Sequence, residues 1–433
     1  NFGESYLQAA RDYAESGNYE EAVAILTQCT EEKPMLYYYK GYYLHCMGST
    51  TEAKAVYETA ETCSPLYCFP NKLEDIAVLK DAIAACSDGA KAYYYLGNLY
   101  YDKLQFDRAV ALWEESEKRD DSFPTVHRNL AIAYYNKKKD PARAQEELER
   151  AYELDETDAR VFLELDQLYK KLEVPFEQRI QNYEKHPEVI EERDDVRIEY
   201  ITLQNLLGNY KKAYESIMSH TFRPWEGAEG KITTQYKIAL LEMAKECIDV
   251  KEYGQAKDYL EKALRYPENL GEGRLEGTKD NHIYYYLGIC NKALGKEQEA
   301  HGYFERASLG DIEPAGVMYY YDQPADMILY QGLAKRELGK EKEARSRFFK
   351  LLDYGEQHLN DEMRIEYFAV SLPDFLIFED DLNRKNKAHC WYLMGLSSLG
   401  LGEFQKAEGF FDKALSYDAN HQNARMYRKM TLK

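Results

Sequence analysis

The segment Tyr93-Tyr-Tyr-Leu-Gly97-Asn-Leu-Tyr100 has two close relatives in the same chain, Tyr284-Tyr-Tyr-Leu-Gly288 and Trp391-Tyr-Leu-Met-Gly395. About a dozen residues after each glycine comes an alanine, then a large aromatic residue, then another small residue. These are Ala109, Trp113 and Ser116, then Ala300, Phe304 and Ala307, and finally Ala407, Phe411 and Ala414. Self-similarity of this kind indicates a repeat architecture.

The residue types at these positions predict two antiparallel helices in each repeat. Small residues such as Gly97 and Ala109 let the paired helices approach closely, while Tyr93, Leu96 and Trp113 fill the layer between them. A single pair cannot bury its own apolar stripe, so successive pairs must stack on one another.

The pattern resembles the tetratricopeptide repeat (TPR), in which W-x2-L-G-x2-Y is followed by A-x3-F and a final Ala and Pro. The chain contains about ten such units, and residues 420–432 form an amphipathic segment that suits a capping helix. The resemblance implies an all-α fold: a right-handed α-solenoid of about ten TPR-like helix-turn-helix repeats with a C-terminal capping helix.

The repeats predict two parts of the chain. Residues 1–191 hold regular repeats one to five, with an extra helix near 73–85. Residues 192–433 hold repeats six to ten and the capping helix, and long loops occur at 267–277, 312–326 and 353–386. Loops of that length are usually functional or disordered, and their aromatic and proline content favours function.

Composition excludes several classes of partner and location. The 433 residues include 76 Asp and Glu against 56 Lys and Arg, and the resulting charge of -20 repels nucleic acid and anionic lipid. No apolar run is long enough for a membrane helix, and residues 1–4 do not resemble a signal peptide. The eight cysteines include no CxxC, so we expect reduced thiols in a cytoplasmic protein and no zinc site. The first residue is not Met, so the chain can be an excised piece of a longer one.

Four loop segments carry a second resemblance. They are Arg223-Pro-Trp-Glu-Gly-Ala-Glu-Gly230, Tyr266-Pro-Glu-Asn-Leu-Gly-Glu-Gly-Arg274, Tyr319-Tyr-Tyr-Asp-Gln-Pro324 and Phe368-Ala-Val-Ser-Leu-Pro-Asp374. With them, residues 221–424 look like the C-terminal helical part of a bacterial family of unknown function. Its members carry an N-terminal β-domain similar to galactose-mutarotase and glycosidase accessory domains. Because that domain is absent here, the resemblance implies a C-terminal fragment whose partners include the missing β-domain and a carbohydrate.

A tyrosine-rich concave surface is the leading candidate for function. The first helix of each TPR-like pair lines the concave face, and nine residues placed there are Tyr38, Tyr42, Tyr94, Asn98, Tyr101, Tyr285, Lys292, Arg336 and Tyr392. Flat rings with hydroxyl groups suit a protein or peptide segment. We therefore predict a non-catalytic scaffold that binds an extended segment or a partner face. The competing interpretation is that these tyrosines only pack between helices.

A chaperone-tail clamp is not expected, since Tyr94 stands where that clamp needs Lys and Leu130 stands where it needs Asn. Self-association through Phe2, Tyr6, Leu7 and Ala10 is a third interpretation, since these residues give the first repeat an apolar face.

The loops supply the alternative function. Eight of their residues are interface candidates: Arg223, Trp225, Glu226, Asn269, Arg274, Asp322, Gln323 and Asp374. They would brace the loops against one another, or flank a sugar site on the missing β-domain, which makes the chain the helical half of a glycoside-hydrolase-like enzyme. There is no HExxH or GxSxG motif, and 76 carboxylates produce close pairs by chance. We expect no catalytic residue, metal site or cofactor in this chain.

Overall fold

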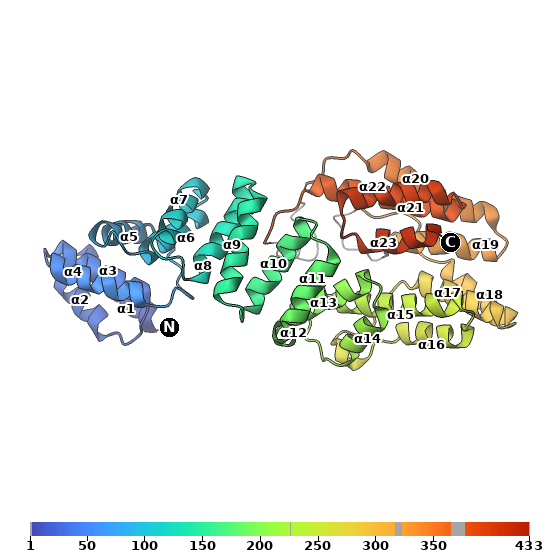
Figure 1. Cartoon of the computed structure of the whole chain (residues 1–433), viewed down its shortest axis with the longest axis horizontal. Helices are drawn as coiled ribbons and strands as arrows, with labels where there is room; N and C mark the ends of the chain where they lie inside the picture. The colour runs from blue at the N-terminus through green and yellow to red at the C-terminus, as the bar shows by residue number, and fades with distance from the viewer. Residues whose placement is uncertain (1, 226, 317–322, 365–376, 433) are drawn as a thin grey trace. The chain divides into compact units, whose positions relative to one another are not determined.

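The computed structural model describes residues 2–225, 227–316, 323–364 and 377–432, and every regular element in these ranges is a helix (Figure 1). The chain divides into two compact units, unit 1 at residues 1–168 and unit 2 at residues 169–433. The division falls inside α10 (Ala159–Lys171). The boundary drawn from the sequence at 191/192 rests on the loops and stays a prediction.

Before α10, unit 1 contains four helix pairs and one additional helix. The pairs are α1 (Phe2–Glu15) with α2 (Tyr19–Gln28), α3 (Pro34–Cys46) with α4 (Thr50–Thr62), α6 (Lys91–Asp102) with α7 (Phe106–Glu117), and α8 (Pro124–Ala133) with α9 (Pro141–Leu154). The additional helix, α5 (Leu73–Ala85), packs against both α3 and α6.

Unit 2 contains α11 (Phe176–Lys185), the short α12 (Pro187–Glu192) and five further pairs. The pairs are α13 (Asp194–Leu206) with α14 (Tyr210–Met218), α15 (Lys231–Asp249) with α16 (Tyr253–Ala263), α17 (Asn281–Ala293) with α18 (Glu297–Ala307), α19 (Asp326–Glu337) with α20 (Glu341–His358), and α21 (Leu382–Leu401) with α22 (Phe404–Tyr417). The last α-helix is α23 (Gln422–Lys429). The nine helix pairs within the two units, and the absence of strands in the described ranges, confirm the predicted all-α solenoid.

The recurring glycine lies where the aromatic residue of its own repeat packs. A Cβ atom on Gly97 would lie 2.5 Å from the ring of Trp113, and one on Gly395 would lie 2.5 Å from the ring of Phe411. A protein interior has no room for such an overlap, so the ring reaches the first helix only where that helix carries glycine. The same contact recurs at Gly41, Gly288 and Gly332. Close approach of the two helices is therefore the reason for the motif.

Tyrosine joins helices through its hydroxyl group as well as its ring. Four tyrosines of unit 1 donate to carboxylates on other elements: Tyr38 to Glu61 (2.7 Å), Tyr39 to Asp75 (2.6 Å), Tyr57 to Asp81 (2.5 Å) and Tyr134 to Glu114 (2.7 Å). A buried tyrosine needs a partner for its hydroxyl group, and a carboxylate is a strong acceptor. Packing thus accounts for much of the tyrosine in this acidic chain.

Three local features differ from the sequence prediction. A π-helical turn, η1 (Tyr134–Lys138), follows α8, and the next residue, Lys139, has a positive φ of 54°. The short helix α12 was not predicted. The long loop predicted at 353–386 is shorter, because α20 continues to His358 and α21 begins at Leu382. No helix in the described ranges is both long and apolar enough to cross a membrane.

Candidate partner-binding surfaces

Tyr38 is a packing residue and not a surface residue. Its side chain is 0% exposed, and its hydroxyl group donates to Glu61. The carboxylate of Glu61 also accepts hydrogen bonds from the backbone N–H groups of Lys91 (2.7 Å) and Ala92 (3.1 Å) at the start of α6. Tyr38 therefore helps to connect α4 to the first turn of α6, and the prediction that its ring is available to a partner is wrong.

The third repeat places one predicted tyrosine inside and leaves two other residues half-buried. Tyr94 is 6% exposed and packs edge-on against Phe123, so its ring is also part of the core. Tyr101 is half-buried, with its ring 5.2 Å from that of Trp113. Asn98 is half-buried as well, and its Oδ1 accepts from Nε1 of Trp113 (3.0 Å) and from Nδ2 of Asn129 on α8 (3.0 Å).

The predicted row of tyrosines is interrupted in unit 1. Tyr42 is half-buried on α3, with its ring 6.0 Å from that of Tyr43. Because α5 packs against both α3 and α6, it separates this part of the second repeat from the third. The hydrogen bond between Asn98 and Asn129 joins α6 to α8 through two half-buried side chains.

In unit 2, the helix α23 packs against part of the predicted tyrosine surface. Tyr392 is 4% exposed and Tyr285 is half-buried. The ring of Tyr330 lies 5.7 Å from that of Tyr285 and 6.3 Å from that of Tyr427 on α23. Tyr427 in turn lies 6.0 Å from Tyr392. Figure 1 shows α23 lying between the α15–α17 side and the α21–α22 side of this unit.

The two predicted cations of unit 2 are held in ion pairs. Nζ of Lys292 lies 2.7 Å from Glu337, and Nε of Arg336 lies 3.0 Å from Glu341. The guanidinium of Arg336 also lies 5.2 Å from the ring centre of Phe348. Both side chains are exposed, so these are surface ion pairs, and a role in binding a partner stays a prediction for each.

One of the predicted loop residues, Asn269, braces one loop against another, and a second, Arg274, makes a contact within its own loop. The side-chain amide of Asn269 donates to the backbone carbonyls of Ile217 and His220, each at 2.8 Å, and its own carbonyl accepts from the N–H of Phe222. Arg274 donates to Asp280 through two nitrogens, at 2.7 and 3.1 Å. Asn269 therefore joins the two loops, and the bracing role of the remaining loop residues stays a prediction.

Arg223 and Trp225 line an open hollow of about 480 Å³. The remaining lining residues are Glu191, Glu192, Arg193, Asp194, Asp195, His220 and Thr221. Gln323 makes a separate brace, because its side chain donates to the carbonyl of Asp311 and accepts from its N–H. Glu226, Asp322 and Asp374 lie outside the described residues. The interface predicted for the loops therefore stays a prediction.

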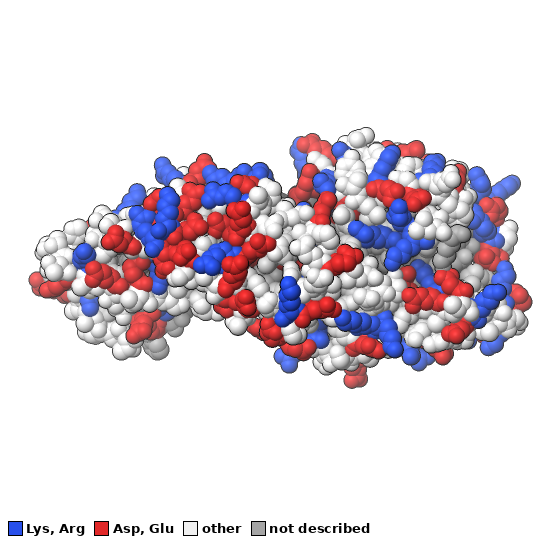
Figure 2. Space-filling model, in the orientation of Figure 1, with Lys and Arg blue, Asp and Glu red and all other residues white. Residues whose placement is uncertain are grey.

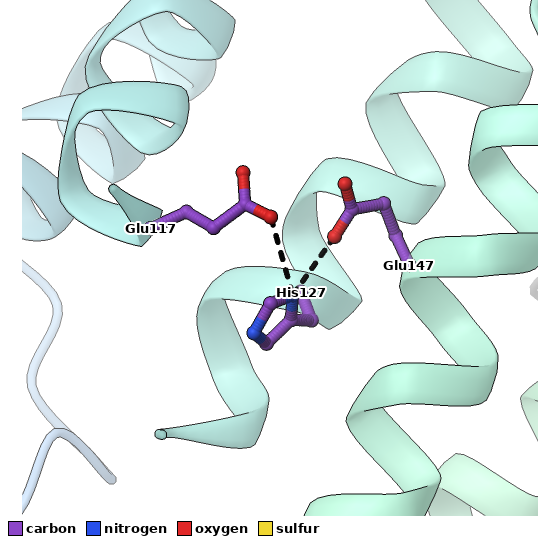
Figure 3. A group of neighbouring side chains, drawn as sticks. All are labelled: Glu117, His127 and Glu147. Atoms are coloured by element: carbon purple, nitrogen blue, oxygen red, sulfur yellow. Dashed lines mark hydrogen bonds and ion pairs between the residues drawn. The ribbon is translucent and has the colours of Figure 1, made fainter. Parts of the chain in front are cut away.

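A buried histidine in unit 1 faces two carboxylates, one on each neighbouring helix (Figure 3). Nδ1 of His127 on α8 lies 2.8 Å from Glu147 on α9 and 3.9 Å from Glu117 on α7, and Nε2 lies 2.9 Å from the carbonyl oxygen of Asp121. Because all these partners are acceptors, both ring nitrogens carry protons. The three side chains could also hold a divalent cation by spacing alone, but Nδ1 already donates its proton to Glu147. We interpret the cluster as an imidazolium ion pair.

This cluster predicts a pH-dependent stability of unit 1. Burial opposes the charge on His127, but its hydrogen bonds to Glu147 and to the Asp121 carbonyl outweigh burial and raise its pKa. Burial and the charge of Glu147 raise the pKa of Glu117. Because the pKa of His127 is higher in the folded state than in the unfolded state, its ion pair contributes to the free energy of unfolding. That contribution is fully present below the unfolded-state pKa, which is about 6.5 for histidine. That stability is lost as the pH rises through the folded-state pKa.

We therefore expect the free energy of unfolding of unit 1 to fall as the pH rises from about 6 to about 8, and His127→Gln to remove most of that fall. Urea denaturation followed by hydrogen exchange in α7 to α9, repeated across this pH range, measures it. His301→Gln is the matched control, because His301 is an exposed histidine of unit 2. Equal pH dependence in wild type and His127→Gln would contradict the ion-pair assignment.

Acidic charge is concentrated in unit 1. Residues 1–168 contain 18 Lys and Arg against 31 Asp and Glu, a net charge of -13, whereas residues 169–433 contain 38 against 45, a net charge of -7. Figure 2 shows a group of Asp and Glu side chains over α7 to α9 on the visible face of unit 1. The field of unit 1 therefore attracts positively charged segments.

Family models of the tetratricopeptide repeat match three stretches of the chain. One model matches residues 94–159, and another matches residues 3–34 and 388–421. Repeats of this kind thus occur in both units. The likeness of residues 221–424 to the bacterial family with an N-terminal β-domain is not among these matches and stays a prediction.

Three solved structures are similar to this chain at low identity. YrrB, described as a TPR protein with an unusual peptide-binding site, is 17% identical over 45% of this chain and 93% of its own, with a TM-score of 0.33. MamA from Desulfovibrio magneticus RS-1 is 15% identical over 44% and 97%, with a TM-score of 0.27. The Naa15/Naa10 structure bound to HypK-THB is 12% identical over 100% and 61%, with a TM-score of 0.35.

Proposed function

We propose that the chain is a protein-interaction scaffold in which unit 1 binds an extended, positively charged segment of a partner across α6 and α8. The TPR-like solenoid supports the general role, because such repeats present extended binding surfaces. The observation that carries the location is the contrast between the two units. In unit 2, α23 covers the tyrosine surface, whereas Asn98 and Asn129 on α6 and α8 remain half-buried at the surface.

The chemistry of this surface suits a peptide backbone flanked by cations. Carboxamides both donate and accept hydrogen bonds, so Asn98 and Asn129 can pair with the N–H and C=O groups of an extended chain. The half-buried ring of Tyr101 adds an apolar face near the end of α6. The charge of -13 on unit 1 favours Lys and Arg in the bound segment and raises the association rate at low salt.

Two labelled peptides of equal length and matched apolar content test this function, one carrying Lys and Arg and the other Asp and Glu. Fluorescence anisotropy with the full chain should show binding of the basic peptide only, weakening as salt is raised. The double variant Asn98→Ala, Asn129→Ala should bind it at least about tenfold more weakly. Trp113 keeps its second hydrogen bond, to the carbonyl of Tyr94 (3.1 Å), so the core of the repeat is retained.

Tyr13→Ala serves as the control, since Tyr13 is 47% exposed on α1 and lies away from the carboxamide pair in sequence. Equal binding of both peptides, or full binding by the double variant, would refute the proposed surface. The alternative function, the helical half of a carbohydrate-active enzyme, rests on the eight loop residues, of which Glu226, Asp322 and Asp374 lie outside the described residues, and it stays a prediction.

A further inference from the structure

The C-terminal helix α23 is enclosed by unit 2. Of its eight residues only Lys429 is exposed, and the other seven are buried or half-buried. A helix that only capped the last repeat would bury one face and leave the other in water. The side chains of α23 and of the turn before it instead contact α10, α11, α14, α15 and α19, in addition to α21 and α22.

Tyr427 is the central contact of α23. Its ring lies among those of Tyr330, Tyr392 and Phe411, with centres 6.0–6.5 Å away. Its hydroxyl group donates to Oδ2 of Asp326 at 2.8 Å, and both residues are at most 8% exposed. An aromatic ring in a pocket, with its polar end paired to a buried group, has the character of an interface anchor.

The other contacts of this segment are specific pairs of side chains. The amides of Gln422 and Gln235 bond to each other at 3.0 and 3.1 Å. Asn420 accepts from Arg179 at 3.0 Å, and Nζ of Lys429 lies 3.2 Å from the hydroxyl group of Tyr210. These bonds run between side chains, so they select the sequence of the helix that occupies the surface.

The charge of the segment is opposite to that of the rest of the chain. Residues 419–433 contain Arg425, Arg428, Lys429 and Lys433 and no Asp or Glu, in a protein of net charge -20. Arg428 pairs with Asp412 and Glu408 on α22, and the guanidinium of Arg425 lies 4.4 Å from the ring centre of Phe176. The segment is therefore complementary to its surroundings in charge as well as in shape.

From these contacts we propose that the surface of unit 2 on which α23 lies, formed by α11, α14, α15, α19 and α21, is a binding site for a short basic helix that presents a tyrosine. In this structure α23 is the resident ligand, and a partner helix of the same chemistry displaces it. This site is separate from the surface of α6 and α8 in unit 1. A failure of either proposal leaves the other intact.

Two features make α23 replaceable. It is eight residues long and joined to α22 by a single connection, and the only element after it in the described residues is the short 3-10 helix η3 (Met430–Leu432), which would leave with it. A helix this short does not persist alone in water, so the segment orders only when it is docked. One buried group also remains unsatisfied beside it: Nδ1 of His282, whose ring lies 5.9 Å from that of Tyr330, has no hydrogen-bond partner among the described residues. A partner side chain that reaches His282 would gain a hydrogen bond that α23 does not make.

The covalent connection between α22 and α23 sets the concentration that a free peptide needs to displace α23. A helix joined by a short connection has an effective concentration on the order of millimolar. An identical free peptide at micromolar concentration therefore binds poorly to the wild-type chain. Weakening the resident helix, by contrast, should open the site without removing any residue of the site itself.

The test uses the full chain and a labelled synthetic peptide of residues 418–433. The variant Tyr427→Ala should bind this peptide at least tenfold more tightly than wild type does, measured by fluorescence anisotropy. Tyr417→Ala, which removes a half-buried tyrosine from the end of α22, should behave as wild type. A peptide carrying the Tyr427→Ala change should fail to bind any of the three proteins.

Hydrogen exchange on the wild-type chain supplies a second readout that needs no variant. Amides of α23 should exchange at least tenfold faster than those of α21 and α22, because local release costs less than unfolding of the repeat. Exchange of α23 only together with α21 would overturn the proposal, since the helix would then be a permanent part of the repeat. So would equal binding of the wild-type and Tyr427→Ala peptides, which would indicate attraction by charge alone.

Discussion

Arg128→Ala is expected to lower the free energy of unfolding of unit 1 by about 3–5 kcal/mol, the cost of removing one partner of a buried ion pair. The guanidinium of Arg128 on α8 makes two parallel hydrogen bonds to Glu164 on α10, from Nε at 2.6 Å and from Nη2 at 2.7 Å. The side chain of Glu164 is 2% exposed. Without Arg128, its carboxylate would be left buried and charged, or would have to take up a proton.

A double variant separates the charge effect from the loss of packing. Arg128→Met with Glu164→Leu replaces the pair by apolar side chains of similar length, and we expect it to unfold within about 1 kcal/mol of wild type. Urea denaturation, with hydrogen exchange in α8 and α10 to localise the effect, measures both variants. If the single and double variants lost the same free energy, packing and not the unpaired carboxylate would account for the result.

The packing of each repeat could be predicted from its sequence. The Gly97 to Trp113 pairing follows from the spacing alone, because both residues belong to one helix pair and the contact is local. The same spacing predicts ten pairs, including those separated by long loops. Elements with no counterpart in the repeat pattern were missed. Examples are α12 and the π-helical turn after Ala133. A π-helical turn arises from one extra residue in a helix, which a repeat pattern does not mark.

The candidate surfaces could be predicted only in part. Position within the first helix places Tyr285 and Tyr392 at equivalent points of their repeats, and their rings contact Tyr330 and Tyr427, which contact each other. It could not reveal that Tyr427 from α23 covers them, because that contact joins residues far apart in the sequence. Likewise, the insertion of α5 against α3 and α6 separates Tyr42 from Asn98, although the repeat register aligns them. The register fixes where a residue lies on its helix, and tertiary packing decides whether it is exposed.

Phe348→Ala is expected to lower the free energy of unfolding of unit 2 by about 3–5 kcal/mol. Phe348 on α20 is 0% exposed, and its ring lies between two first helices. A Cβ atom on Gly332 of α19 or on Gly400 of α21 would each lie 2.3 Å from this ring. The same ring therefore closes its own repeat and joins it to the next, so its loss opens a cavity at both contacts.

Phe349→Ala is the matched control, since the neighbouring ring is 40% exposed and should cost less than about 1 kcal/mol. Hydrogen exchange in α19 and α21 distinguishes the two variants, with both helices less protected in Phe348→Ala. Because Asp326 on α19 and Tyr392 on α21 both contact Tyr427, loosening these helices should also increase exchange in α23. Faster exchange of α19 and α21 with unchanged α23 would mean that the C-terminal helix is held chiefly by α14 and α15, where Tyr210 and Gln235 contact it.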